Sequence, residues 1–227
     1  MNRWSKALAV ASLSAALGVY ALQLGLLESP FPLVQLVLKG AGVALLAAFA
    51  ATQAKSLDGW LLVLAMAVGA VGDVAIEFSI VVGAAAFLVG HLCASVLYLR
   101  NRRRNLSGSQ KALALVVLVA VPLLAFIMPA DRTLALLAAI YAAALAIMAA
   151  TAWTSAFSRY GVGLGAMLFV FSDLLIFAGL GPLSGSSIPR MLIWPAYYIG
   201  QYLVCLGVVT ALANPQFGRS GRFVTSA

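Results

Sequence analysis

Residues 60–100 read WLLVLAMAVGAVGDVAIEFSIVVGAAAFLVGHLCASVLYLR and hold most of two long apolar runs, 59–79 and 82–100. Each run is close to the length of about 20 residues that a helix needs to cross the hydrocarbon core of a bilayer. Acidic side chains in the stretch are limited to Asp73 and Glu77, near the end of the first run. The stretch therefore predicts two transmembrane helices joined by a short turn.

The same pattern continues on both sides of this pair. The chain is 64% hydrophobic and 9% charged, with a mean hydropathy of +1.07. This composition excludes an ordinary soluble domain. We expect a single integral membrane domain, 1–227, with an all-α fold: a polytopic transmembrane bundle of eight helices. The expected helices are 7–27, 33–51, 59–79, 82–100, 111–129, 132–152, 160–180 and 190–213.

The positive charges lie mostly on one side of the predicted bundle. The first apolar run is too long for the core of a signal peptide, so we retain it as a helix. With an N-in, C-in topology, the outer connections hold only Arg132 and Arg190. The net charge of +8 then reflects the positive-inside rule rather than a nucleic-acid partner. The inner positions are Arg3, Lys6, Lys55, Arg100, Arg102, Arg103, Arg104, Lys111, Arg159, Arg219 and Arg222.

Several polar side chains lie inside runs that are otherwise apolar. A charge in hydrocarbon costs about 2.5–3.5 kcal/mol on insertion scales, so such residues usually serve a function. A rise of about 1.5 Å per residue places them in one layer in the outer half of the bilayer or near its midplane. The layer comprises Lys39, Asp73, His91, Tyr141, Asp173, Tyr197, Tyr198 and Gln201.

Helical spacing adds to this picture. Tyr197 and Tyr198 are four and three residues before Gln201, which allows one polar face toward the interior. Glu77 follows Asp73 by four residues and either shares its face or reaches the outer interface.

Two of the polar residues allow two interpretations of their role. Lys39 can neutralise a carboxylate or extend to the surface. His91 can be an interhelical hydrogen-bonding residue or a catalytic one.

The aspartates suggest acid-base chemistry. Asp is too short to extend to the membrane surface, so Asp73 and Asp173 are the strongest functional candidates. If both and Glu77 were ionised, Lys39 would offset only one charge in a low-dielectric layer. Desolvation and repulsion therefore favour at least one carboxylic acid near neutral pH. An acid and a base together suffice for general acid-base attack by water.

Metal chemistry is not indicated by the sequence. With one histidine in the whole chain, a multi-histidine zinc site is excluded. Cys93 and Cys205 lack the spacing of a metal or redox motif. We expect no cofactor.

Four short motifs carry a resemblance to a known family. The chain resembles the YhhN/TMEM86 family of multi-spanning membrane proteins, whose animal members are lysoplasmalogenases. Lys39, near the start of the expected helix 33–51, and Tyr141 in the expected helix 132–152 also fit the family pattern. The motifs are VGDV at 71–74, VGH at 89–91, FVFSDLL at 169–175 and YYIGQYL at 197–203.

The resemblance implies a function and a site. It makes Asp73 and Asp173 the catalytic pair of a hydrolase that cleaves the vinyl ether of a lysoplasmalogen. The products would be a fatty aldehyde and a glycerophospho head group. The expected partners are a lysophospholipid or related substrate and membrane lipids, without an obligate protein partner, in a bacterial inner membrane. The resemblance implies that the site is lined by Lys39, His91, Tyr198 and Gln201, and we add Tyr141, which fits the family pattern, as a substrate-binding residue. Tyr197 and Glu77 are further candidates from their helical spacing, although Glu77 departs from the family pattern.

Two other function classes remain open. Presenilin-like proteases also use two intramembrane aspartates, but Gly69-Ala70-Val71-Gly72 before Asp73 lacks their Gly-x-Gly-Asp form. A proton-coupled carrier or lipid-binding membrane protein would use the Asp, Glu and His side chains as a relay. No matching pair of Pro- or Gly-interrupted helices points to an inverted-repeat transporter.

Overall fold

Eight long helices account for most of the chain, as predicted. The structure is a computed structural model that describes residues 3–28, 31 and 33–217. Arg219 and Arg222, which the charge pattern includes, lie outside these residues. The helices are α1 (Arg3–Gln23), α2 (Leu33–Gln53), α3 (Leu57–Ala75), α4 (Ile80–Arg100), α5 (Gly108–Ile127), α6 (Arg132–Thr154), α7 (Leu164–Gly179) and α8 (Ile188–Ala213), with a π-helical turn η1 (Arg159–Gly163) leading into α7.

Short polar caps decide where several helices begin. The Ser56 and Ser79 hydroxyls accept hydrogen bonds from backbone N–H groups in the first turns of α3 and α4. Ser107 forms a capping box with Gln110 at the start of α5, and Asp131 caps α6. Such caps satisfy backbone donors that the helix itself cannot. They lie just before the apolar runs, so these helices start up to three residues earlier than hydropathy alone suggests.

The end of α3 lies four residues before the expected end, as both ends of α1 do, and for α3 the difference affects a candidate site residue. The helix ends at Ala75 rather than at residue 79, because the chain turns before Ser79 caps α4. Glu77 therefore lies in the turn between the two helices and not on the helical face of Asp73.

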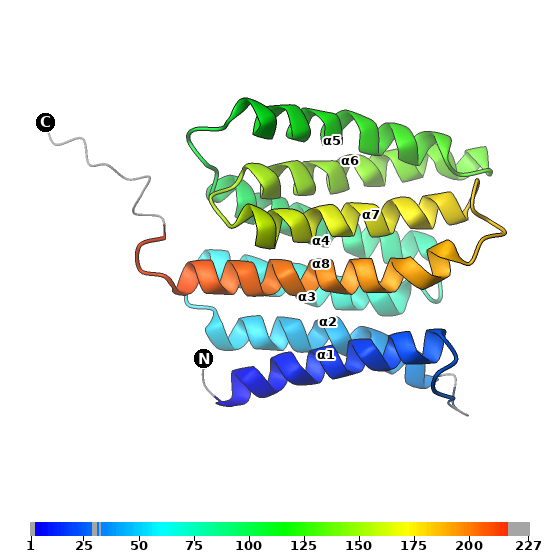
Figure 1. The fold of residues 1–227 in the computed structure, drawn as a ribbon, viewed down its shortest axis with the longest axis horizontal. Coiled ribbons are helices and arrows are strands. Elements are labelled where there is room, and N and C mark those ends of the chain that lie inside the picture. The colour runs from blue at the N-terminus through cyan, green and yellow to red at the C-terminus, as the bar shows by residue number, and fades with distance from the viewer. Residues whose placement is uncertain (1–2, 29–30, 32, 218–227) are drawn as a thin grey trace, which may run out of the picture.

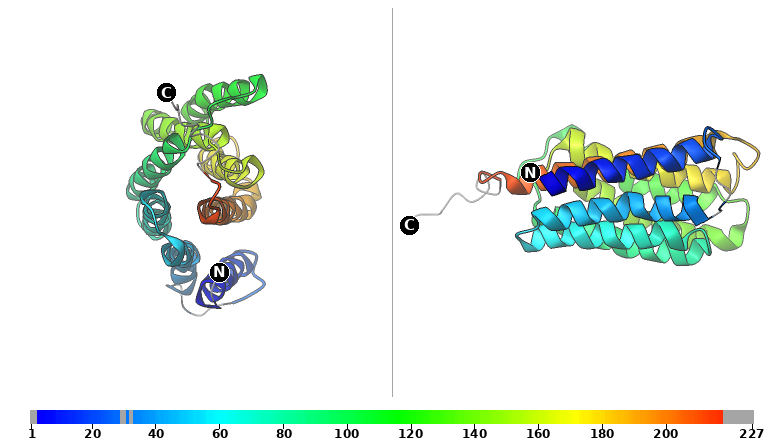
Figure 2. Two further views of the ribbon diagram at one scale, coloured as in Figure 1. Left: turned by 90° about the vertical axis from the view of Figure 1, so that its left-hand side faces the viewer. Right: turned by 90° about the horizontal axis from the view of Figure 1, so that it is seen from below.

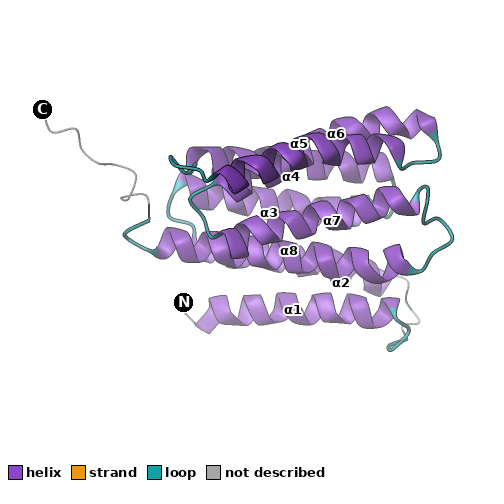
Figure 3. Ribbon diagram, turned by 45° about the horizontal axis from the view of Figure 1, so that its top comes forward, coloured by secondary structure: helices purple, strands orange, loops and turns teal. Residues whose placement is uncertain are grey.

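The helices form a closed ring with one helix outside it. Consecutive helices run in opposite directions, so the start of α1 and the end of α8 lie at the same end of the bundle (Figure 1). Seen end on, α1, α2, α3, α4, α6, α7 and α8 follow one another around the ring (Figure 2). The remaining helix, α5, packs on the outside of α6 (Figures 2 and 3).

Glycines allow the close approach of α7 and α8. A Cβ atom added at Gly165 would lie 2.7 Å from the Gly200 carbonyl oxygen, and one added at Gly200 would lie 2.7 Å from that of Gly165. Small residues of this kind let the backbones of membrane helices come into contact. The crossing fixes the position of Asp173 on α7 relative to Tyr197 on α8.

Within the described residues, all eight helices are long and apolar enough to cross a membrane when η1 is counted with α7. Large apolar side chains also cover the outer surface; Leu115, Val119 and Leu123 on α5 are examples. A surface of this kind would be unfavourable in water but is suited to contact with lipid tails. The protein is an integral, multi-pass membrane protein.

Candidate functional site

Both aspartates are buried in the interior of the bundle, and each accepts a hydrogen bond from a tyrosine. Asp73 on α3 is 2% exposed and Asp173 on α7 is 5% exposed. The Tyr197 hydroxyl on α8 donates to Asp73 Oδ2 at 2.9 Å. The Tyr141 hydroxyl on α6 donates to Asp173 Oδ2 at 2.5 Å. Two acidic groups are thus held in place by partners from two further helices.

The Asp173 cluster includes His91 and Ser172. His91 Nε2 on α4 lies 3.0 Å from the Tyr141 hydroxyl, so the imidazole, phenol and carboxyl form a chain of hydrogen-bonding groups. The Ser172 hydroxyl lies 3.3 Å from Asp173 Oδ1. Both oxygens of Asp173 therefore have a hydrogen-bonding neighbour.

The Asp73 cluster extends through Tyr197 to Gln201. Gln201 Nε2 donates to the Tyr197 hydroxyl at 3.3 Å, one helical turn along α8. Gly69 on α3 faces this pair, since a Cβ atom there would lie in van der Waals contact with Gln201 Nε2 at 3.4 Å and with the Tyr197 hydroxyl at 3.8 Å.

Aromatic rings separate the two clusters. Phe169 on α7 packs edge to face against His91 at 4.9 Å and against Tyr197 at 5.0 Å between ring centroids. Phe87 on α4 packs against Phe169 and Tyr197 in the same way. Among the described residues, no hydrogen bond joins the two carboxyl groups directly, although they are close enough for their charges to interact.

Lys39 and Glu77 pair with each other. Lys39 Nζ on α2 lies 2.5 Å from Glu77 Oε1, and the two side chains are 17% and 50% exposed. Lys39 also has an electrostatic interaction with Asp73. The ion pair thus lies at the edge of the Asp73 cluster, toward the surface, and not within it.

Tyr198 belongs to a different part of the interior. Its hydroxyl shares a 2.7 Å hydrogen bond with the Ser12 hydroxyl on α1, which also donates to the Gly42 carbonyl. Its ring stacks on Trp194. Of the two adjacent tyrosines, Tyr197 contacts an aspartate and Tyr198 joins α1, α2 and α8.

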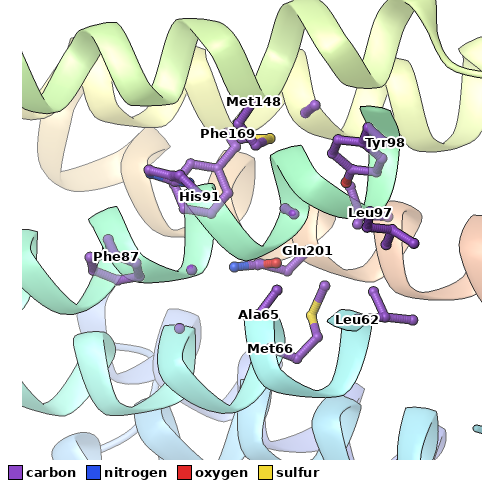
Figure 4. A pocket seen from close by; sticks show the side chains of 15 residues that line it. Leu62, Ala65, Met66, Phe87, His91, Leu97, Tyr98, Met148, Phe169 and Gln201 are labelled. Carbon is purple, nitrogen blue, oxygen red and sulfur yellow. The ribbon is translucent and has the colours of Figure 1, made fainter. Parts of the chain in front are cut away.

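A small cavity touches both clusters. It measures about 30 Å³ and is bordered by His91 on one side and Gln201 on the other (Figure 4). Met66 and Ala65 of α3 lie on the far side of Gln201 from Phe169 (Figure 4). A water molecule needs about 10–15 Å³ and several polar partners, so the cavity has room for one or two waters.

A larger apolar groove leads to Asp173. It measures about 240 Å³ and lies between the N-terminal halves of α4 and α6, with part of α7 behind them. Asp173 and Tyr141 are the residues with polar side chains among the described residues that line it. Asp73 lines neither the cavity nor the groove.

No group of three His, Cys, Asp or Glu side chains within the described part of the chain lies where it could hold a metal ion. The groups available for chemistry at this site are the carboxyl, phenol, imidazole and amide groups already described.

The family comparison supports the motif pattern. A model of the YhhN family matches residues 34–208. The chain belongs to the YhhN family. The match runs from the start of α2 into α8 and includes both aspartates, all their hydrogen-bonding partners and Lys39. No curated protein and no solved structure matches the chain.

Three residues of the site were not expected from the sequence: Phe87, Phe169 and Ser172. Helical spacing could have indicated the two phenylalanines, and sequence adjacency could have indicated Ser172. Phe87 precedes His91 by four residues and Phe169 precedes Asp173 by four, so each shares a face with a polar residue. Ser172 directly precedes Asp173 in the FVFSDLL stretch at 169–175.

Proposed function

We propose that the chain is a membrane-embedded lipid hydrolase, and specifically a lysoplasmalogenase. The observation that carries the proposal is the pair of buried aspartates, each held by a tyrosine, within a bundle of transmembrane helices. Carboxyl groups at this depth are costly, and chains that keep them generally use them. Membership of the YhhN family supports the same activity.

The reaction needs an acid, a base and water. The acid donates a proton to the vinyl carbon farther from the ether oxygen, and the carbon bonded to that oxygen becomes part of an oxocarbenium ion. A carboxylate stabilises this cation, as in glycosidases. Water adds to the cationic carbon and loses a proton, which restores the acid. The resulting hemiacetal breaks its C–O bond to release a fatty aldehyde and the glycerophospho alcohol.

The chain offers groups for each of these steps. Asp173 borders the apolar groove and is held by Tyr141, which suits it to meet the vinyl ether. The small cavity between His91 and Gln201 has room for the attacking water. Asp73 lies behind the aromatic rings and is held by Tyr197; an ionised carboxyl group there would favour the developing cation across the rings without touching it.

The proposal includes an orientation. The bias of positive residues supports an N-in, C-in orientation in a bacterial inner membrane. Asp73 and Asp173 both lie in the half of the bundle away from those ends, since α3 and α7 run away from them. The site then lies in the outer half of the bilayer, and the substrate head group faces outward.

The decisive experiment compares three Asp→Asn variants. Purified Asp73→Asn and Asp173→Asn should remain folded but lose aldehyde release from an alkenyl lysolipid. Asp131→Asn is the matched control, because Asn is an equally good helix cap and Asp131 lies outside both clusters. Full activity in either site variant rejects the proposed pairing.

The choice of lipids tests the bond that is cleaved. Alkenyl, alkyl and acyl lysolipids are incubated with the protein and analysed by mass spectrometry. Turnover of the alkenyl lipid alone supports the proposal. Proton flux in liposomes without turnover of any lipid would indicate a carrier instead.

A further inference from the structure

The walls of the groove between α4 and α6 are almost entirely hydrocarbon. They include Val81 and Leu88 of α4, Leu134 and Leu137 of α6, and Phe177 of α7. No cationic side chain is among its described lining residues. A phosphate or other charged head group would find no partner there, since a buried anion requires a counter-charge or hydrogen-bond donors.

The groove opens sideways as well as reaching the outer end of the bundle at Pro129 and Leu180. Val81, Leu137 and Ile140 line it and are each more than half exposed on the outer surface of the bundle. In a membrane these side chains contact lipid tails, so the groove is continuous with the hydrocarbon core of the bilayer.

The inner end of the groove is the Asp173 carboxyl with the Tyr141 hydroxyl. On α6, Leu134 and Tyr141 are seven residues apart, which corresponds to about 10 Å along the helix. An apolar path of this length therefore connects the outer end of the bundle with an acidic group.

Size and polarity identify the occupant. A volume of 240 Å³ is about eight times that of the small cavity, which leaves room for a row of methylene groups. A peptide would leave its backbone N–H and C=O groups unpaired along the apolar walls, which is strongly unfavourable. One hydrocarbon chain fits, whereas a pair of chains exceeds the space.

We propose that the groove binds the hydrocarbon chain of a single-chain lipid that moves in laterally from the bilayer, and that it presents the reacting bond to Asp173. The inference rests on the proposed function for the identity of that bond. Asp173 is then the carboxyl that contacts the lipid. The chain extends from it through the sideways opening at Val81 and Ile140, and the head group points past Pro129 and Leu180 toward the outer end of the bundle.

Two matched pairs of neighbouring residues test the groove. Val81 and Val82 on α4 are similarly exposed, as are Leu137 and Leu136 on α6, but only Val81 and Leu137 line the groove. Each residue is replaced by Trp. Val81→Trp and Leu137→Trp should lower turnover of the alkenyl lysolipid at least about tenfold, because the added ring fills the space of the chain. Val82→Trp and Leu136→Trp should retain it.

A binding measurement separates this inference from the proposed activity. The probe is a lysolipid analogue with a photoreactive diazirine in the first carbons of its chain, used on the native protein and on Asp173→Asn. Labelled peptides should come from α4 residues 80–88 and α6 residues 134–141 in both proteins, and Val81→Trp should reduce the labelling.

The outcomes are distinct. Labelling of the groove without turnover of any lysolipid supports the groove and rejects the proposed activity. Turnover together with labelling elsewhere, or with full activity in both Val81→Trp and Leu137→Trp, overturns the groove and leaves the proposed activity standing.

Discussion

The Tyr141 hydroxyl lies between His91 and Asp173 and is within hydrogen-bonding distance of both, at 3.0 Å and 2.5 Å. A phenol in this position fixes one oxygen of Asp173 and links the carboxyl to the imidazole. Three helices, α4, α6 and α7, meet at this one hydroxyl group.

Replacing Tyr141 by Phe should lower lipid turnover without creating a cavity in the interior of the bundle. The ring remains packed against His91 and Phe177, but Asp173 Oδ2 loses its donor. Asp173 then lacks the donor that orients its carboxyl group, so kcat should fall about tenfold while KM changes less, and the unpaired buried acceptor should lower stability by about 1–3 kcal/mol. Steady-state kinetics tests this, with the exposed Tyr160→Phe as control. Unchanged kcat in Tyr141→Phe would contradict the role given to this hydroxyl.

The adjacent residues Tyr197 and Tyr198 should respond differently to the same change. Tyr197→Phe removes the donor to Asp73 and should lower kcat. Tyr198→Phe removes only the bond to Ser12, so it should cost about 1 kcal/mol of stability and leave kcat nearly intact. Thermal unfolding and kinetics are measured on both variants. Equal loss of kcat in the two variants would mean that Tyr198 also serves the site.

Glu77→Gln should have a small effect on stability and on lipid turnover. Its partner Lys39 is close to the surface and Glu77 is half exposed, and exposed ion pairs contribute about 0–1 kcal/mol. Melting temperature and turnover should therefore both stay near the values of the native chain. A loss of activity as large as that of Asp73→Asn would make Glu77 part of the catalytic machinery.

Arg132 is a cation that contacts a residue of the groove. Its guanidinium donates to the carbonyl of Pro129, which is a groove residue, whereas Arg190 donates to Gln23 on α1. If Arg132 meets the phosphate, Arg132→Gln should raise KM about tenfold for a phosphate-bearing lysolipid. An alkenyl glycerol without phosphate should be unaffected, and Arg190→Gln is the matched control. Equal KM values for the native chain and Arg132→Gln would place the phosphate elsewhere.

The sequence predicts the number and approximate course of the helices because long apolar runs have few alternatives to spanning a membrane. It predicts their ends less well, since these depend on single capping residues such as Ser56 and Ser79. The consequence is clearest at Glu77. Its spacing of four residues from Asp73 allows a shared helical face, but α3 ends at Ala75 and Glu77 lies in the turn before α4.

The site itself could be predicted only in part. Charge and depth identify Asp73 and Asp173, because a carboxyl group in an apolar run is conspicuous. They do not distinguish Tyr197 from Tyr198, which are about 100° apart on the same helix and differ only in which neighbours they meet. Phe169 is equally inconspicuous as one apolar residue among many, yet its ring lies between the two clusters.

The sideways opening between α4 and α6 also bears on how products would depart. A released aldehyde would already touch the acyl tails of surrounding lipids through Val81 and Ile140. The water-soluble fragment would leave at the membrane surface instead. Cleavage at such a position sorts its two products into different phases, and their separation opposes recombination.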